Sequence, residues 1–262
     1  MRCATASSSK PQATALKNIN DDFFAGAYRE LWRQTIPAGL TGAEADLIMD
    51  ECSLQRGSRV ADLMCGYGRH ALELARRGCN VTAIDNSEAY ISEIRENAAV
   101  ESLPVAAQCT PVLDWKPEGQ YDALLCMGNS FAFFNESDSR ILLRRFAAAL
   151  APGGHLLINT WMVAEIAYRH FKEREWHELP GFRYLISNRF QLEPARIESE
   201  HILIDRENRV ETLQAVDYIF TIGELGAMMT DAGLRPGPVY STPRKRPFGM
   251  GDGRAYLFAT KA

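Results

Sequence analysis

The sequence lacks the features that would place it in a membrane or in an oxidising compartment. No apolar run reaches the roughly 18–20 residues needed to cross a bilayer, and the N-terminus has no apolar signal-peptide core. Six cysteines are present, but none forms a CxxC pair and no Cys/His cluster has zinc spacing. We therefore expect a cytoplasmic protein in a reducing environment, with no disulfide framework, no metal and no membrane partner.

A large basic surface is also missing. The formal net charge is −4, and the one basic cluster, residues 244–246, is short and flanked by prolines. General nucleic-acid binding needs a clustered basic surface, so no nucleic-acid partner is expected. The basic cluster itself is open to two interpretations, a solvated loop or a clamp on an anionic substrate.

What the sequence does contain is a regular alternation of strand and helix. Apolar runs typical of buried strands alternate with helical patterns between residues 59 and 161. The strands are expected at 59–64, 80–84, 105–109, 121–127 and 155–161, and the helices at 69–77, 87–98 and 138–150. Right-handed βαβ units of this kind predict an α/β fold with a doubly wound, mostly parallel sheet.

The segments on either side of this alternation have different patterns. Residues 1–20 are rich in Ser, Ala, Thr and Lys, and are expected to form a disordered tail. Residues 21–262 are expected to form a single domain, in which 21–52 are an N-terminal helical cover. Within that cover, aromatic and apolar side chains recur at helical spacing, namely Phe23, Phe24, Tyr28, Leu31 and Trp32.

A second change of pattern follows the fifth strand. Residues 169–178 resemble a charged helix, and three consecutive strands are expected at 182–189, 196–205 and 210–220. Consecutive strands with turns between them predict an antiparallel β flap inserted over residues 162–220. A helix at 222–232 and strands at 238–241 and 255–260 then complete the chain.

A short glycine loop indicates where a ligand binds. Gly66-Tyr67-Gly68 follows an apolar strand and opens a helix, and Asp85 ends the next strand. Glycines there let the backbone approach a ligand closely, and a strand-end carboxylate can accept both hydroxyls of a ribose. The pattern predicts an adenosine-containing cofactor at the carboxyl edge of the sheet.

Two cofactors fit a loop of this kind. Ala71 occupies the third position of a Gly-x-Gly-x-x-Gly/Ala pattern, so a dinucleotide is formally permitted. Asp62, however, lies in the strand four residues before the first glycine, where it would repel a pyrophosphate. In a methyltransferase an acid at this place can order the loop and face the amino group of a methionine moiety. Asp62 therefore favours S-adenosylmethionine.

These motifs resemble the class I S-adenosylmethionine-dependent methyltransferases over residues 44–262. Residues 62–70, DLMCGYGRH, resemble the first motif of that family, and Asp85-Asn86-Ser87 resembles the second. Residues 128–131, GNSF, resemble the small-molecule branch that includes glycine N-methyltransferase and amino-sugar N-methyltransferases. Further typical features are Pro152-Gly153-Gly154 before the fifth strand and residues 231–234 before a closing hairpin.

The resemblance implies a fold and a donor. The fold is a seven-stranded, mostly parallel Rossmann-like sheet whose last strand is antiparallel, with the β flap inserted in it. The donor is S-adenosyl-L-methionine, and the product is S-adenosyl-L-homocysteine. The chain departs from the family after the third strand, where an acid often contacts the adenine amino group. Thr110, a backbone carbonyl or the nearby Asp114 is left to take that role.

The candidate site residues fall into two groups. Those expected to bind the cofactor are Tyr28, Trp32, Asp62, Cys65, Gly66, Gly68, Asp85, Asn86, Thr110 and Met127. Those expected to face the methyl acceptor are Asn129, Trp161 and His170. Core packing for the aromatic residues, a turn-forming role for Asn129 and a surface position for His170 are the alternatives. Displacement at an activated sulfonium needs alignment more than a base, so no catalytic residue is assigned.

The function predicted from these observations is methyl transfer to nitrogen or oxygen of a small molecule. The expected partner is a small-molecule methyl acceptor, and a homodimer is an open alternative to a monomer. An RNA or protein methyltransferase, a nicotinamide-dependent oxidoreductase and a regulatory subunit without activity are the competing hypotheses.

Overall fold

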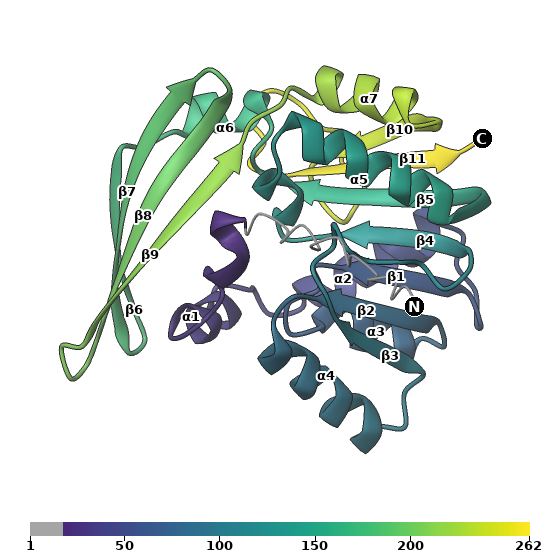
Figure 1. The fold of residues 1–262 in the computed structure, drawn as a ribbon, viewed down its shortest axis with the longest axis horizontal. Helices are drawn as coiled ribbons and strands as arrows, with labels where there is room; N and C mark the ends of the chain where they lie inside the picture. Colours follow the sequence, from purple (N-terminus) through teal and green to yellow (C-terminus); the bar gives the residue numbers. More distant parts are fainter. Residues whose placement is uncertain (1–17) are drawn as a thin grey trace, which may run out of the picture.

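The computed structural model describes residues 18–262, which form a seven-stranded sheet between helices and a separate four-stranded sheet beside it (Figure 1). The predicted tail lies outside the described residues except at 18–20. These three residues differ from the prediction, because the 3-10 helix η1 (Ile19–Asp22) begins there and Asn20 is buried. Among the described helices, none has both the length and the apolar character required to cross a membrane.

The large sheet has the predicted topology. Its strand order is β10-β11-β5-β4-β1-β2-β3, and β1 to β5 are mutually parallel where they pair. The last strand, β11, runs antiparallel to both β5 and β10. The bounds are β1 (Arg59–Leu63), β2 (Asn80–Asp85), β3 (Val105–Cys109), β4 (Tyr121–Cys126), β5 (Leu150–Thr160), β10 (Leu234–Tyr240) and β11 (Ala255–Lys261).

Helices cover both faces of this sheet, which explains why its central strands are apolar throughout. Side chains alternate along a strand, so Leu125 packs in one core and Leu124 in the other. The first core includes α2 (Leu40–Glu51), α3 (Arg69–Arg76) and α4 (Glu88–Val100). The second includes α5 (Glu136–Ala149), α6 (Ala164–His170) and α7 (Ile222–Asp231). The fold class predicted from the sequence is confirmed.

The N-terminal cover consists of short helices separated by glycines. Gly26 and Gly39 have φ of +60° and +78°, which interrupts a right-handed helix, so η1, α1 (Tyr28–Gln34) and α2 are separate. Phe23 and Phe24 consequently precede α1 and do not lie on its face. The α1 region packs against apolar side chains of the four-stranded sheet, and Figure 1 shows it between the two sheets.

The four-stranded sheet is the predicted antiparallel flap with one additional strand. Its order is β6 (Arg174–Leu179), β7 (Phe182–Leu192), β8 (Ala195–Asp205) and β9 (Val210–Tyr218), with neighbours antiparallel. The charged helix predicted over 169–178 is wrong: α6 ends at His170, and β6 pairs with β7. The segment forms an edge strand with mostly exposed side chains, so its charges carry no inward-facing periodicity from which the strand could be recognised.

Candidate functional site

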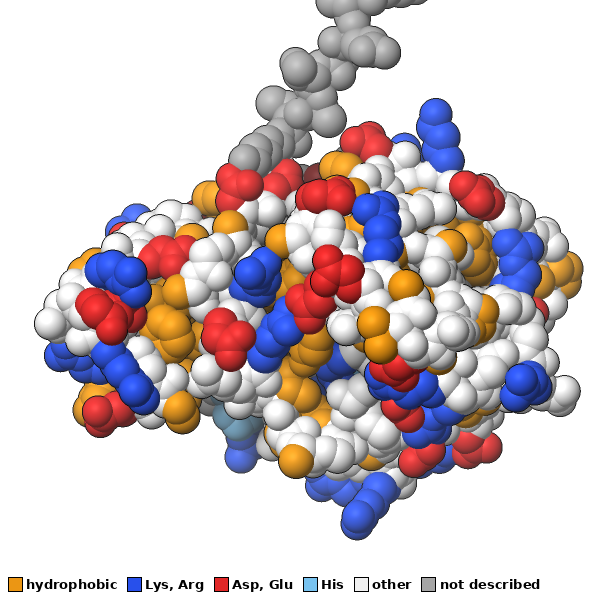
Figure 2. Space-filling view, turned by 90° about the horizontal axis from the view of Figure 1, so that it is seen from below, with side chains coloured by type: hydrophobic (Ala, Val, Ile, Leu, Met, Phe, Trp, Pro, Cys, Tyr) orange, Lys and Arg blue, Asp and Glu red, His pale blue; other side chains and the backbone are white. Residues whose placement is uncertain are grey.

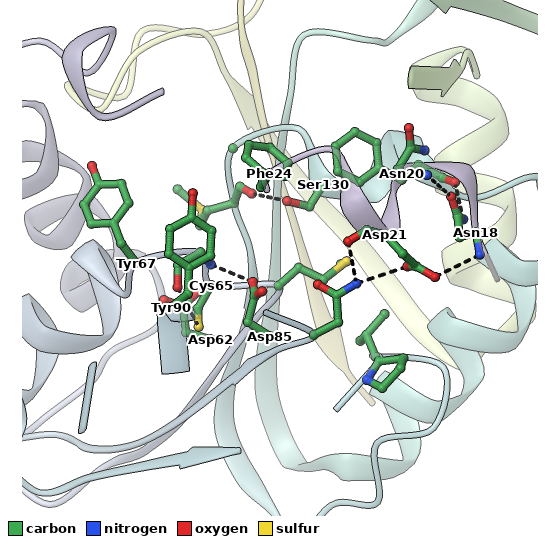
Figure 3. Close-up of a pocket in the computed structure, with 18 of the residues that line it drawn as sticks. Asn18, Asn20, Asp21, Phe24, Asp62, Cys65, Tyr67, Asp85, Tyr90 and Ser130 are labelled. Atoms are coloured by element: carbon green, nitrogen blue, oxygen red, sulfur yellow. Dashed lines mark hydrogen bonds between the residues drawn. The ribbon is translucent and has the colours of Figure 1, made fainter. Parts of the chain in front are cut away.

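A cavity of about 300 Å³ lies at the carboxyl ends of β1, β2 and β4 (Figure 3). Parallel strands end at one edge of the sheet, so residues distant in sequence meet there. Seven of the ten predicted cofactor residues line this cavity, namely Trp32, Asp62, Cys65, Gly66, Asp85, Asn86 and Met127. Of the other three, Tyr28 lines a neighbouring cavity, and Gly68 and Thr110 lie outside the lining of both.

The two glycines of the loop after β1 have different roles. Both have positive φ, +55° at Gly66 and +75° at Gly68. A Cβ on Gly66 would meet only the Tyr90 ring, at 4.0 Å, so the loop is open towards the cavity. A Cβ on Gly68 would lie 2.6 Å from Cγ1 of Ile94. Gly68 therefore allows the start of α3 to pack on α4, and Gly66 gives a ligand access to the backbone.

Asp85 ties the glycine loop to the end of β2. Its Oδ2 accepts the Gly66 N–H at 2.8 Å, and its Oδ1 accepts the Ser87 N–H at 2.9 Å. Burial raises the pKa of the Asp85 carboxyl, and these backbone N–H groups act in the opposite direction. Each carboxylate oxygen can accept a further hydrogen bond, so the side chain suits a vicinal diol such as a ribose. Figure 3 shows the carboxylate directed into the cavity.

Asp62 is a buried carboxylate with an unsatisfied oxygen. Its Oδ2 accepts the Ala71 N–H at 3.1 Å, whereas its buried Oδ1 has no hydrogen-bond partner among the described residues. Burial raises the pKa of Asp62 to about 6, against the attraction of His70 and Arg69. A buried polar atom without a partner is costly, and because Asp62 lines the cavity, a ligand donor or cation there would satisfy it.

A buried hydrogen-bond network around Glu44 lies beneath the glycine loop, and the sequence patterns did not indicate it. Glu44 of α2 accepts Arg69 Nη1 at 2.6 Å and the Tyr256 hydroxyl at 2.7 Å, and lies 2.9 Å from His70 Nε2. Burial alone would raise the pKa of Glu44, but the His70 hydrogen bond and the His70 and Arg69 charges outweigh it and lower the pKa to about 2. Arg69 and His70 both line the cavity, so Glu44 holds two wall residues in place.

The N-terminal segment closes the opposite wall. Asn18, Asn20, Asp21 and Phe24 all line the cavity, and Asn86 Nδ2 donates to Asp21 Oδ1 at 3.1 Å (Figure 3). The first two of these residues were predicted to lie in a tail. A local signal was present, since Asn18 caps η1 in a capping box with Asp21, but the contacts that fix the segment reach the distant Phe133 and Val216 carbonyls.

A second cavity, of about 390 Å³, adjoins the first and is covered by the flap. The two share four wall residues, Phe24, Trp32, Gly128 and Phe133. All three residues predicted to face an acceptor line the second cavity, Asn129, Trp161 and His170. The flap adds Tyr184, His201 and Asp217, which sequence analysis did not select because alternation in a strand does not show what the strand faces.

Thr110 does not contribute a side chain to either cavity. Its N–H donates to the Asp85 carbonyl at 2.8 Å, which continues the pairing of β3 with β2. The following residues, from Pro111 to Asp114, line the first cavity instead. Asp114 is thus the acidic side chain that this wall offers, a short distance along the chain from the family position.

The residues present fit S-adenosylmethionine better than a dinucleotide. The unsatisfied Oδ1 of Asp62 suits an ammonium group and would repel a pyrophosphate. Asp85 suits the ribose, and the open backbone at Gly66 allows a close approach. The fold and this site define a Rossmann-like, nucleoside-binding α/β domain.

Comparison with known proteins shows what the central part of the chain is similar to. Residues 60–154 match a family model described as a methyltransferase domain. A glycine/sarcosine N-methyltransferase of Halorhodospira halochloris is 32% identical over 123 residues, which are 45% of each chain. A carboxy-S-adenosyl-L-methionine synthase of Shewanella pealeana is 31% identical over 147 residues, 53% of this chain and 59% of that one. The chain thus spans about half the length of these curated relatives.

Solved structures agree on the fold over nearly the whole chain. The S-adenosylmethionine-bound amino pentose methyltransferase CalS10 of Micromonospora echinaspora superposes with a TM-score of 0.67 at 21% identity. The superposition covers 90% of this chain and 97% of that one. The central part of the chain thus matches a methyltransferase domain, and the described chain has the fold of solved S-adenosylmethionine-dependent methyltransferases.

Proposed function

We propose that this protein transfers the methyl group of S-adenosylmethionine to a nitrogen or oxygen atom of a small molecule. The observation that carries the proposal is the junction of the two cavities. The cavity that fits the cofactor shares Phe24, Trp32, Gly128 and Phe133 with a second cavity under the flap. A donor in the first cavity and an acceptor in the second would meet at that wall.

Different side chains would bind different parts of S-adenosylmethionine. Asp85 would hold the ribose and Asp62 the amino group of the methionine moiety, with Asp114 beside the adenine. When bound, S-adenosylmethionine supplies a methyl group on a positively charged sulfonium. The aromatic residues of the shared wall exclude water and orient the acceptor, which are the main contributions a protein makes to this displacement.

Several observations support a small acceptor over a macromolecule. The second cavity is closed on one side by the flap, and its volume of about 390 Å³ is in the range of small-molecule sites. Figure 2 shows acidic and basic side chains interspersed on one face, with no broad basic patch there. Two of the proteins named above are, by name, methyltransferases of small molecules, one of glycine and sarcosine and one of an amino pentose. A homodimer and a cytoplasmic location stay predictions.

Calorimetric titration with S-adenosylhomocysteine tests the donor. We expect the wild-type protein to bind it, and Asp85→Asn to bind about 10- to 100-fold more weakly, because a charge-assisted hydrogen bond contributes about 1.5–3 kcal/mol. Asp231→Asn is the matched control, because Asp231 lies exposed at the end of α7 and pairs with Arg140 of α5. Absence of binding by the wild-type protein at high micromolar concentration would overturn the proposed function. Mixing the protein with NADH tests the nicotinamide-dependent alternative, and we expect no change in NADH fluorescence.

A further inference from the structure

One carboxylate of the flap lines the acceptor cavity at a defined position. Asp217 lies on β9, and its Oδ1 accepts a hydrogen bond from Asn129 Nδ2 at 2.9 Å. This is the hydrogen bond that joins the flap strand β9 to the residue after Gly128, and Gly128 belongs to the wall shared with the cofactor cavity. Asp217 is therefore tied to the side of the cavity where a methyl group would arrive.

The orientation of Asn129 is determined by its other contacts. Its Oδ1 accepts the Trp161 backbone N–H at 3.1 Å and the Thr160 hydroxyl at 2.7 Å. Because a backbone N–H can only donate, the amide oxygen must face Trp161 and the amide nitrogen must face Asp217. The Asn129 N–H also donates to the Asn159 carbonyl at 3.0 Å. Asn129 is consequently a rigid link between the end of β5 and the Asp217 carboxylate.

Nothing else in the cavity balances the charge of Asp217. Its described lining contains no arginine, and Lys172 is paired with Glu175 at 2.9 Å. His201 is neutral near pH 7, because burial lowers its pKa to about 4, and its Nδ1 forms a hydrogen bond with the Tyr184 hydroxyl. Exposed His170 is at the end of α6. The cavity therefore suits a cation and offers no free guanidinium to a carboxylate or phosphate.

Aromatic side chains complete this environment. Tyr28 and Trp32 line the same cavity as Asp217. The Trp161 ring, whose centroid is 6.1 Å from that of Trp32, carries the guanidinium of Arg254, which is itself paired with Glu44. Aromatic faces attract organic cations, and this attraction strengthens when water is excluded. A carboxylate among aromatic rings is the combination expected for an ammonium ion.

We propose that Asp217 selects an amine acceptor, binding it as the ammonium ion and removing one proton before methyl transfer. This inference rests on the proposed function and specifies the acceptor class for the same site. An N–H proton of the ammonium passes to a carboxylate oxygen of Asp217, which frees the nitrogen lone pair. That lone pair forms the bond to the methyl carbon as the carbon–sulfur bond breaks, with the bonding electrons left on sulfur. The methylated ammonium departs, and Asp217 releases its proton to water.

The protonation behaviour of Asp217 agrees with this role. Burial raises its pKa to about 7, against the hydrogen bond from Asn129. Burial and the charge of Asp217 raise the pKa of Tyr28 on α1, to about 12, and of Tyr184 on β7. Both hydroxyls therefore stay protonated near neutral pH. A group that titrates near the working pH is well suited to accept a proton from an amine.

Matched probes test the inference on the protein loaded with S-adenosylhomocysteine. Benzylamine, benzyl alcohol and benzoate share a ring and differ in charge, and their affinities are measured by calorimetry. We expect benzylamine to bind the wild-type protein at least about tenfold more tightly than the other two, since the carboxylate–ammonium hydrogen bond is charge-assisted. Asp217→Asn should lose this preference, and Asp217→Glu, which keeps the charge, should retain it in part.

Glu200→Gln, at an exposed position on β8 outside the cavity lining, is the control and should behave as the wild type. Equal affinity of the wild-type protein for benzylamine and benzyl alcohol would overturn the inference, as would a preference that survives in Asp217→Asn. Titration of S-adenosylhomocysteine in each variant reports whether the cofactor site is folded. Failure of that titration in the wild-type protein counts against the proposed function, whereas binding of S-adenosylhomocysteine without amine preference counts only against Asp217.

Discussion

At the scale of single residues, the cofactor cavity contains two carboxylates in different states of hydrogen bonding. Both oxygens of Asp85 accept backbone N–H groups, so this side chain is held before any ligand arrives. Asp62 has a buried oxygen without a partner among the described residues. Asp85 thus preserves the geometry of the site, and Asp62 carries a cost that a bound cation would offset.

Asp62→Asn should raise the stability of the free protein and weaken its binding of S-adenosylhomocysteine. The native pKa of Asp62 is about 6 against an ordinary 3.8, so between these pH values the folded state binds more protons than the unfolded state. The free energy of unfolding therefore falls as the pH rises through this window. Without ligand at pH 8, the variant should be more stable by about 1–3 kcal/mol, because it has no carboxylate to ionise.

Urea unfolding at pH 8 and pH 4 measures this difference, which should shrink at the lower pH, where Asp62 of the folded wild-type protein is protonated. The same variant should bind S-adenosylhomocysteine at least about tenfold more weakly, since a neutral amide replaces the charged partner of the amino group. A variant less stable than wild type at pH 8, with unchanged affinity, would contradict the assignment.

At the scale of elements, the site depends on how the N-terminal cover meets the flap. Glu211 of β9 accepts the Ala27 N–H at 2.8 Å at the start of α1, and Asn20 exchanges two hydrogen bonds with the Val216 backbone, each of 2.9 Å. These contacts seat η1 and α1 on the flap. Since α1 carries Trp32, they also place a wall that both cavities share.

Gly26→Ala should disturb this junction. The new Cβ would lie 2.0 Å from Glu211 Oε1, and the φ of +60° at this position is unfavourable for alanine. We expect the free energy of unfolding to fall by about 1–2 kcal/mol and the affinity for S-adenosylhomocysteine to fall with it. Gly42→Ala is the control, because Gly42 lies inside α2 with open space around it and should gain about 0.5–1 kcal/mol. Equal effects in the two variants would exclude a specific junction at Gly26.

At the scale of the whole molecule, the buried Glu44 connects three elements that are far apart in the chain. It joins α2 to α3 through Arg69 and His70, and to β11 through Tyr256. A buried ion pair is costly to form, but removing one partner leaves the other uncompensated. The network therefore holds the glycine-loop side of the cofactor cavity to the opposite end of the sequence.

Glu44→Gln should lower the free energy of unfolding at pH 7 by about 3–5 kcal/mol, measured in urea. Glu101→Gln removes an exposed partner of Arg76 and should change it by less than about 1 kcal/mol. The native pKa of Glu44 is about 2 against an ordinary 4.5, so its contribution is present above pH 4.5 and is lost as the pH falls through 2. Acid unfolding of Glu44→Gln that matches the wild-type profile would refute this account.

Local patterns were sufficient for most of the large sheet. The third strand was predicted at 105–109 and is found there as β3, and the helix predicted over 87–98 is found as α4, with the Ser87 hydroxyl accepting the Tyr90 N–H at its start. Periodicity, turn residues and the glycine loop act within a few residues of each other, so they can be read without knowing the fold. The strand β6 could not be predicted in this way, because many of its side chains are charged, most are exposed, and they show no alternation of buried and exposed positions. Its pairing with β7 decides its structure.

The sequence by itself determined the family resemblance, the topology of the main sheet and the carboxyl edge at which Gly66 and Asp85 meet. Only the tertiary structure decided which side chains close the site. The hydrogen bond from Asn129 to Asp217 spans 88 residues, and the one from Tyr256 to Glu44 spans 212. Contacts over such separations depend on how the flap and the cover pack on the sheet, and that packing sums many weak, non-local terms that no local motif records.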